Sequence, residues 1–248
     1  MRSRDNLFDC DDCVEKFAFD ERVANVFPDM IKRSVPGYVN LVSLTGVIAS
    51  KFIRGNSCVY DLGCSLGAVS ASILANLEQC PKTLFAVDNS TAMLEQCRAN
   101  LSGFSEPPIE FLNLDIRDLK MKNASLVAMN FTLQFLPLED RNQMIENIHD
   151  ALLPDGAFIL SEKIKLTPPE DDELVIKLHE AFKSANGYSD LEIAAKRSAL
   201  DNVLIPETTH THIKRLRNAG FNQVVKWHQS LNFVSFLALK NSKESDYA

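Results

Sequence analysis

The feature that most constrains this chain is a strand, a glycine turn and a helix in immediate succession at residues 59–68, Val-Tyr-Asp-Leu-Gly-Cys-Ser-Leu-Gly-Ala. The apolar run before the turn is typical of a buried strand. Gly63 and Gly67 let the backbone approach a nucleotide-like ligand closely, because a side chain there would collide with it. Ser65 stands where the commoner Gly-x-Gly-x-Gly form has its middle glycine. A tight turn without any ligand is the alternative interpretation.

Short apolar runs alternate with amphipathic stretches over most of the chain, which is typical of a parallel sheet covered by helices. The pattern predicts strands at 58–62, 83–87, 109–114, 124–130 and 157–161, and helices at 67–77, 91–101 and 139–153. A helix at 208–218 and two strands at 223–229 and 233–239 follow. The result is an α/β fold with a Rossmann-like seven-strand sheet that closes in a β-hairpin, which an ordinary dinucleotide-binding fold lacks.

Two helical regions fall outside this alternation and are long enough to cover a site. Residues 19–54 predict an N-terminal helical cap, in which Pro28 separates helical pieces at 19–27 and 29–33. Residues 165–205 predict a helical insert before the final hairpin, broken at Asn186 and Gly187. We expect one domain over 19–240, a flexible leader at 1–18 and a polar tail at 241–248.

Polar residues mark the points where three further strands end: Asp88 and Asn89, Asp115 with Ile116, and Asn130. The carboxyl ends of parallel strands meet at one edge, where open α/β sheets bind ligands. A carboxylate after the second strand can accept hydrogen bonds from both ribose hydroxyls. One after the third strand can accept from an adenine amino group, while the adjacent isoleucine packs on the ring. Each residue alone is explained by a structural cap, but their joint placement favours a nucleoside site.

Charge and hydropathy narrow the choice of partner. The chain has 248 residues and a net charge of −7, without the basic stripe of a protein that grips a nucleic-acid backbone. A small-molecule substrate is therefore favoured over direct contact with nucleic acid. No apolar stretch reaches the roughly 20 residues that a membrane span needs, so we expect no membrane partner and a cytoplasmic location.

No catalytic residue can be assigned from the sequence. Cys10 and Cys13 form a Cys-x-x-Cys without the further ligands of a zinc site, so no metal is expected. A backbone role for the turn explains Cys64 better than nucleophilic attack. Arg197 in the insert can clamp a carboxylate with two hydrogen bonds, although a solvated helix charge is the simpler interpretation. Surface or packing roles are expected for the five histidines, His149, His179, His210, His212 and His228.

Short motifs spread over nearly the whole chain point to one family. They are Phe-Asp-Glu-Arg-Val at 19–23, Arg-Ser-Val-Pro-Gly-Tyr at 33–38, Tyr-Asp-Leu-Gly-Cys-Ser-Leu-Gly at 60–67, Asn-Phe-Thr-Leu-Gln-Phe at 130–135, Ser-Glu-Lys at 161–163, Ala-Asn-Gly-Tyr-Ser at 185–189 and Lys-Arg-Ser at 196–198. With them the chain resembles the carboxy-S-adenosyl-L-methionine synthases, within the class I methyltransferase superfamily. The first and last motifs are not general methyltransferase features, which makes the resemblance specific.

The resemblance implies an activity without methyl transfer. These enzymes convert S-adenosyl-L-methionine and prephenate to carboxy-S-adenosyl-L-methionine and phenylpyruvate, and the product serves a second enzyme that makes uridine-5-oxyacetic acid in tRNA. A homodimer is also implied. Two alternatives stay open: a conventional methyltransferase acting on a small acid, and a non-catalytic S-adenosylmethionine-binding protein. The implied ligand contacts are Tyr38, Gly63, Cys64, Ser65, Asp88, Asn89, Asp115, Ile116, Asn130 and Arg197.

Overall fold

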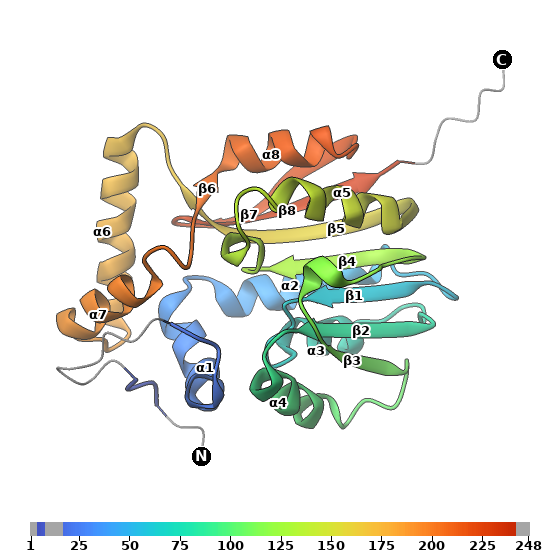
Figure 1. The fold of residues 1–248 in the computed structure, drawn as a ribbon, viewed down its shortest axis with the longest axis horizontal. Helices are drawn as coiled ribbons and strands as arrows, with labels where there is room; N and C mark the ends of the chain where they lie inside the picture. Colours follow the sequence, from blue (N-terminus) through green and yellow to red (C-terminus); the bar gives the residue numbers. More distant parts are fainter. Residues whose placement is uncertain (1–3, 8–16, 242–248) are drawn as a thin grey trace.

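A computed structural model describes residues 4–7 and 17–241 of the chain, and Figure 1 shows a twisted sheet with helices on both faces. The strand order is β3-β2-β1-β4-β5-β8-β7, with β6 paired to β5 off this path. The expected α/β sheet of seven strands with a closing hairpin is therefore confirmed, and β6 is an addition. The strands are β1 Cys58–Leu62, β2 Thr83–Asp88, β3 Ile109–Asn113, β4 Ala124–Asn130, β5 Leu152–Lys165, β6 Glu207–Thr208, β7 Gln223–Ser230 and β8 Phe233–Lys240.

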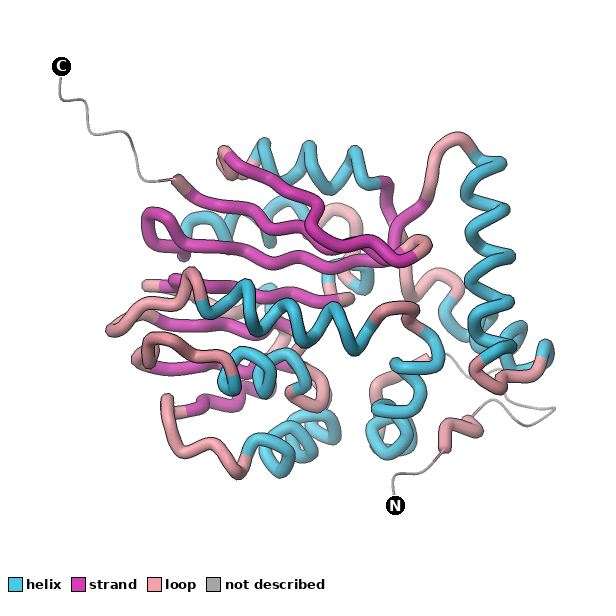
Figure 2. Tube along the Cα trace, turned by 180° about the vertical axis from the view of Figure 1, so that it is seen from behind, coloured by secondary structure: helices cyan, strands magenta, loops and turns pink. Residues whose placement is uncertain are grey.

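The two faces of the sheet carry different helices. On one face, α3 (Ala68–Ala75) and α4 (Thr91–Leu101) pack with the end of α2 (Tyr38–Ser50) against alternate residues of the central strands. On the other, α5 (Arg141–Ala151) and α8 (Thr209–Asn218) cover the intervening residues. Figure 2 shows α2 running across the face that lies behind the sheet in Figure 1. The central strands are buried on both sides, as their continuous apolar sequences predict.

The N-terminal cap contains one correction to the sequence prediction. Pro28 does not divide the first helix, because α1 runs without a break over Glu21–Ser34 with Pro28 inside it. Proline removes one helical hydrogen bond and disfavours the preceding turn. The cost is offset by packing, since one side of α1 buries Val23, Val26 and Met30 in a cluster with Leu66 and Met93.

The fifth strand provides a second correction. A strand was expected at 157–161, yet β5 begins at Leu152, directly after α5, and continues to Lys165. Its pairing with β8 runs from Gly156 opposite Lys240 to Lys163 opposite Phe233, which extends the strand at both ends. Pro154, Asp155 and Gly156 do not end the strand. They lie within β5 where its register with β4 shifts, between the pairs Ala124–Leu152 and Leu126–Ala157.

The helical insert stands beyond the carboxyl edge of the sheet. It consists of α6 (Pro169–Ala185) and α7 (Asp190–Leu200), and the break between them falls at Asn186 and Gly187 as predicted. Figure 1 shows α1, α6 and α7 together on the side toward which the parallel strands point. The cap and the insert therefore both lie at the edge where the sequence places the ligand.

The leader and the tail are described only in part. The Cys10 and Cys13 pair lies outside the described residues, as does the tail beyond residue 241. Within the expected leader, Asp5 is only 1% exposed and forms hydrogen bonds with Asp29 and Arg33 on α1. No helix in the described part of the chain is long and apolar enough to cross a membrane.

Candidate functional site

The turn after β1 is shaped by contacts with two neighbouring strands. Gly63 has a φ of +73°, and a Cβ on it would lie 2.1 Å from Thr132 Oγ1 in the loop after β4. The amides of Gly63 and Cys64 both donate to the carbonyl oxygen of Val87 on β2, at 2.8 and 3.0 Å. Glycine is required at this point because both the backbone conformation and the space exclude a side chain.

Asp88 joins this turn to the next helix. Its Oδ2 accepts from the amide of Ser65 and its Oδ1 from the amide of Ser90, each at 2.9 Å. Ser90 caps α4 by accepting from the amide of Met93. Asn89 between them is exposed. A carboxylate has about four lone-pair directions, so Asp88 retains acceptor capacity for the hydroxyl groups of a ligand.

Asp61, on β1, is a buried carboxylate beneath the cap. Its Oδ2 accepts from both the amide and the hydroxyl of Ser70 on α3, at 3.0 and 2.6 Å. Burial raises the pKa of Asp61 to about 6, and the charge of Asp88 acts in the same direction. Tyr38, the first residue of α2, faces the same carboxylate: burial raises the pKa of its hydroxyl, and the charge of Asp61 raises it further. The cap thus places Tyr38 over the end of β1.

The carboxylates of Asp61 and Asp88 lie close together without a countercharge. Burial raises the pKa of Asp88 as well. No lysine or arginine in the described part of the chain forms an ion pair with either group. A ligand that brings positive charge relieves this repulsion, whereas an anionic dinucleotide adds to it. The sulfonium and ammonium groups of S-adenosylmethionine therefore fit these residues.

The end of β3 places Asp115 and Ile116 side by side. Asp115 Oδ1 accepts from the amide and Nε of Arg117, at 2.9 and 3.0 Å, while its Oδ2 accepts from Nη2 at 2.7 Å. These hydrogen bonds hold the pKa of Asp115 below its usual range, so the carboxylate stays ionised as an acceptor. Arg117 also reaches Asp140, at 2.6 Å. Ile116 is buried and begins a short 3₁₀ helix, η1 (Ile116–Asp118).

Asn130 ends β4 with half of its amide unused. Its Oδ1 accepts from the hydroxyl of Ser161 on β5, and Ser161 in turn shares a hydrogen bond with Ser235 on β8. Its Nδ2 is buried and has no hydrogen-bond partner among the residues that the structure describes. An unpaired buried donor costs about 1–3 kcal/mol. A ligand oxygen at this position would satisfy it.

Arg197 is on α7, apart from the residues at the strand ends. Its side chain is 62% exposed, and its Nη1 lies 3.1 Å from Glu180 Oε1 on α6. It is near enough to Lys163, at the end of β5, to lower the pKa of that amine, although burial is the larger cause. The structure therefore brings Arg197 to the edge of the site but pairs it with a neighbouring helix.

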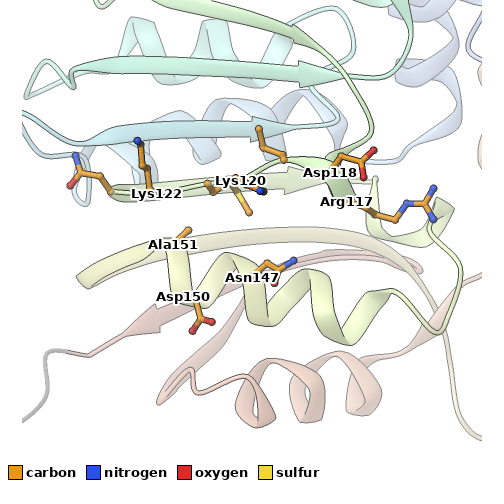
Figure 3. A pocket seen from close by; sticks show the side chains of 10 residues that line it. Arg117, Asp118, Lys120, Lys122, Asn147, Asp150 and Ala151 are labelled. Carbon is orange, nitrogen blue, oxygen red and sulfur yellow. The ribbon is translucent and has the colours of Figure 1, made fainter.

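Two cavities in the described part of the chain lie beside the predicted strand-end residues and not among them. One of about 620 Å³ opens between α5 and the segment that follows η1 (Figure 3), and it includes none of the sequence-predicted residues. A smaller cavity of about 140 Å³ touches Tyr38 at the start of α2. Residues 4–7 and 17–241 contain no group of three or more His, Cys, Asp or Glu side chains able to hold a metal ion. Charged and amide side chains of the larger cavity include Arg117, Lys120, Lys122, Asn147 and Asp150.

Comparison with known proteins identifies the family. Residues 59–156 match the model of a methyltransferase domain. The carboxy-S-adenosyl-L-methionine synthase of Vibrio cholerae is 48% identical over 242 residues, covering 97% of this chain and 98% of the relative. The enzyme of the same name from Pseudoalteromonas translucida is 48% identical over 241 residues, covering 97% and 100%. The chain belongs to the carboxy-S-adenosyl-L-methionine synthase family.

Solved structures of more distant proteins share the fold. Human N-acetylserotonin methyltransferase, in complex with S-adenosylmethionine, superposes with a TM-score of 0.62 and 16% sequence identity. The match covers 90% of this chain and 56% of that one. A cyclopropane synthase of Mycobacterium tuberculosis superposes with a TM-score of 0.56 and 12% identity, over 76% and 62%. The synthase family thus builds on the class I methyltransferase sheet.

Sequence reasoning missed several residues of this site. Asp61 lies inside the turn motif, and its position within a buried apolar strand was an available signal. Glu162, on β5, is fully buried. Its Oε1 accepts from the amide of Leu133, in the segment after β4, at 3.0 Å. A carboxylate in an apolar strand was again a signal. Thr132, which excludes a side chain at Gly63, could not be found without the fold.

Proposed function

We propose that this chain converts S-adenosyl-L-methionine to carboxy-S-adenosyl-L-methionine, taking the carboxyl group from prephenate and releasing phenylpyruvate. The observation that carries the proposal is the 48% identity to synthases of that name over 97% of the chain. The uncompensated carboxylates of Asp61 and Asp88 and the free amide of Asn130 support a cationic nucleoside ligand.

The proposed chemistry requires that the methyl group of S-adenosylmethionine loses a proton beside a prephenate that loses carbon dioxide. The positive sulfur makes the methyl protons acidic, so loss of one proton leaves a carbon nucleophile. Prephenate aromatises by losing its ring carboxylate as carbon dioxide and its ring hydroxyl as hydroxide. The hydroxide takes the methyl proton and forms water, while the methyl carbon bonds to the carbon dioxide. No protein base is required by this balance, which agrees with the absence of a convincing nucleophile or base in the sequence.

The nucleoside roles follow from position. In this proposal the backbone at Gly63, Cys64 and Ser65 approaches the ligand, and Asp88 with Asn89 accepts from the ribose hydroxyls. Asp115 accepts from the adenine amino group and Ile116 packs on the ring. Asn130 donates Nδ2 to an oxygen of the ligand. Tyr38 and Arg197 act at the sulfonium end, where Arg197 pairs with the new carboxylate. These contacts to substrate and product are Tyr38, Gly63, Cys64, Ser65, Asp88, Asn89, Asp115, Ile116, Asn130 and Arg197.

The test is the mass of the nucleoside that copurifies with the protein, followed by incubation with S-adenosylmethionine and prephenate. We expect a bound nucleoside heavier than S-adenosylmethionine by the mass of carbon dioxide, and phenylpyruvate formed in step with it. Methylation of a small acid would instead support a conventional methyltransferase. Tight binding of the nucleoside without any turnover would support a non-catalytic binding protein. Either result overturns the proposal.

We further propose a homodimer in the cytoplasm that supplies carboxymethyl groups for uridine-5-oxyacetic acid in tRNA without binding the tRNA itself. The net charge of −7 supports the absence of direct nucleic-acid contact. An exposed apolar surface on α2, formed by Val39, Leu44 and Val47, supports self-association. A strain that lacks the protein should lose uridine-5-oxyacetic acid from its tRNA, and unchanged modification would contradict this role.

A further inference from the structure

Two lysines at the carboxyl end of β5 lie in a partly buried position without a partner. Lys163 is near the end of β5, and Lys183 is on the last turn of α6 above it. Both side chains are half-buried. Within residues 4–7 and 17–241, neither amine forms a hydrogen bond or an ion pair. Removing an ammonium group from water is unfavourable unless an anion compensates it.

The surrounding acids compensate the two amines only in part. Burial lowers the pKa of Lys183 to about 8, and the charge of Lys163 lowers it further. Glu180 raises the pKa of both amines and Asp172 raises that of Lys163, but burial and the neighbouring cations outweigh them. Glu180 also pairs with Arg197, and Asp172 accepts from the amide of Leu166 at 2.9 Å. The pair therefore leaves an excess of positive charge at the carboxyl edge of the sheet.

Aromatic side chains lie beside the same two lysines. Phe233 on β8 is directly opposite Lys163 in the strand register, so the two share a face of the sheet. Its ring centroid lies 5.8 Å from that of Phe131 and 5.1 Å from that of His179. His179 is one helical turn before Lys183, and burial lowers its pKa to about 3, so its ring is neutral.

Phe131 is held in an unfavourable backbone conformation. It directly follows Asn130 and has a φ of +57°, which is rare for a bulky residue. Its amide donates to the carbonyl oxygen of Ser161 at 2.6 Å, and its ring packs edge-on against Phe233. Such strain concentrates at functional sites, where the surrounding structure maintains it. The strained residue therefore directs a half-buried ring toward Phe233, which is opposite Lys163 in the strand register.

We propose that Lys163 and Lys183 bind the carboxylate groups of an unsaturated cyclic acid whose ring lies against Phe131. This inference rests on the proposed function and deepens it, because it assigns the carboxyl donor to the end of β5, next to Asn130. The two ammonium groups can each pair with one carboxylate of a dicarboxylate. The Phe131 ring can pack against a ring that becomes aromatic as it reacts. The nucleoside contacts on β1, β2 and β3 are separate from it.

The experiment compares Lys163→Met and Lys183→Met with two controls. Methionine keeps an unbranched apolar side chain and removes only the charge. Lys165→Met on β5 and Lys177→Met on α6 remove exposed amines from the same elements. We expect Lys163→Met and Lys183→Met, the two cluster variants, each to raise the KM for prephenate at least about tenfold. The Kd for S-adenosylmethionine should change less than about twofold. Lys183→Arg should recover part of the loss, and the controls should behave as the unchanged protein.

The outcomes separate this inference from the proposed function. Unchanged KM in both cluster variants, or equal losses for prephenate and S-adenosylmethionine, overturns the lysine assignment while the function stands. If the unchanged protein binds prephenate by calorimetry but does not turn it over, the function fails and the variants' Kd for prephenate decides the assignment. If the unchanged protein neither binds nor consumes prephenate, both fail.

Discussion

At the scale of single residues, Arg197 is the side chain expected to distinguish product from substrate. Its ion pair with Glu180 is exposed and contributes little to stability, so the guanidinium is free to exchange partners. Arg197→Leu should weaken binding of the carboxylated nucleoside about tenfold or more, because a charged hydrogen bond contributes about 1.5–3 kcal/mol. Binding of S-adenosylmethionine should change little. Calorimetry with both ligands measures the difference.

The control for Arg197 is Arg217→Leu, which removes an exposed guanidinium from α8. It should leave both affinities unchanged. Equal losses for the two nucleosides in the Arg197 variant would show that this residue does not recognise the added carboxylate.

Glu162 is a buried residue whose negative charge opposes folding. Burial raises its pKa to about 8 from an ordinary value of 4.5, against the opposite effect of Arg141. A carboxyl with a raised folded-state pKa contributes stability that is present below pH 4.5 and is lost as pH rises toward 8. Glu162→Gln lacks this titration. Its free energy of unfolding, relative to the unchanged protein, should therefore rise by at least about 2 kcal/mol between pH 5 and pH 9.

Urea unfolding at several pH values tests this prediction, because all other titrating groups are common to both proteins. Glu146→Gln on the exposed side of α5 is the control and should show no such trend. A difference between Glu162→Gln and the unchanged protein that stays constant with pH would refute the assignment of the titration to Glu162.

At the scale of elements, residues 4–7 connect the helical insert to the N-terminal cap through hydrogen bonds and an ion pair of Asp5. The amide of Asp5 donates to Asp29 on α1 at 2.8 Å, and its carbonyl accepts from Arg33 at 3.1 Å. Its carboxylate accepts from the Tyr188 hydroxyl and lies 3.6 Å from Lys196 Nζ on α7. Lys196 is adjacent to Arg197. Asp5 therefore positions the helix that presents the proposed carboxylate clamp.

Asp5→Ala should loosen α7, because the buried Tyr188 hydroxyl and Lys196 amine lose the carboxylate that they share, and the Lys196 amine then has only Ser34 Oγ, at 2.9 Å. We expect a loss of about 2–4 kcal/mol in stability and faster amide hydrogen exchange across α7, with β1 unchanged. Asp171→Ala removes an exposed carboxylate from α6 and is the control. Equal acceleration of exchange in β1 and α7 would mean that Asp5 supports the whole fold and not the insert.

An element can be predicted from the sequence when the contacts that form it join residues close together along the chain. The β1 turn and the break at Asn186 and Gly187 follow from local rules, and both were predicted. The continuous α1 and the long β5 depend on tertiary contacts that outweigh local signals at Pro28 and 154–156. The site follows the same division. Strand-end residues could be located from periodicity, whereas the contact of Asp5 with Tyr188 joins residues 183 positions apart and leaves no local pattern.

At the scale of the whole molecule, α2 connects the site to the surface. It begins at Tyr38, above Asp61, and its thirteen residues, YVNLVSLTGVIAS, include no charged side chain. One side packs on α3, whereas Val39, Leu44 and Val47 are 59%, 44% and 46% exposed. An uncharged helix with an apolar outer side is typical of a surface that a second copy covers. We therefore expect the contact of the proposed homodimer to include α2 and to stabilise the position of Tyr38.

Val47→Lys should convert the dimer to a monomer, because a charge at the centre of an apolar interface is costly to bury. Light scattering coupled to size-exclusion chromatography measures the mass, and calorimetry measures whether nucleoside affinity falls with it through the loss of support for Tyr38. Leu138→Lys alters a residue of similar exposure, 48%, outside α2 and should leave the mass unchanged. A Val47 variant that is still dimeric would place the interface elsewhere, and an unchanged protein that is monomeric would remove the dimer altogether.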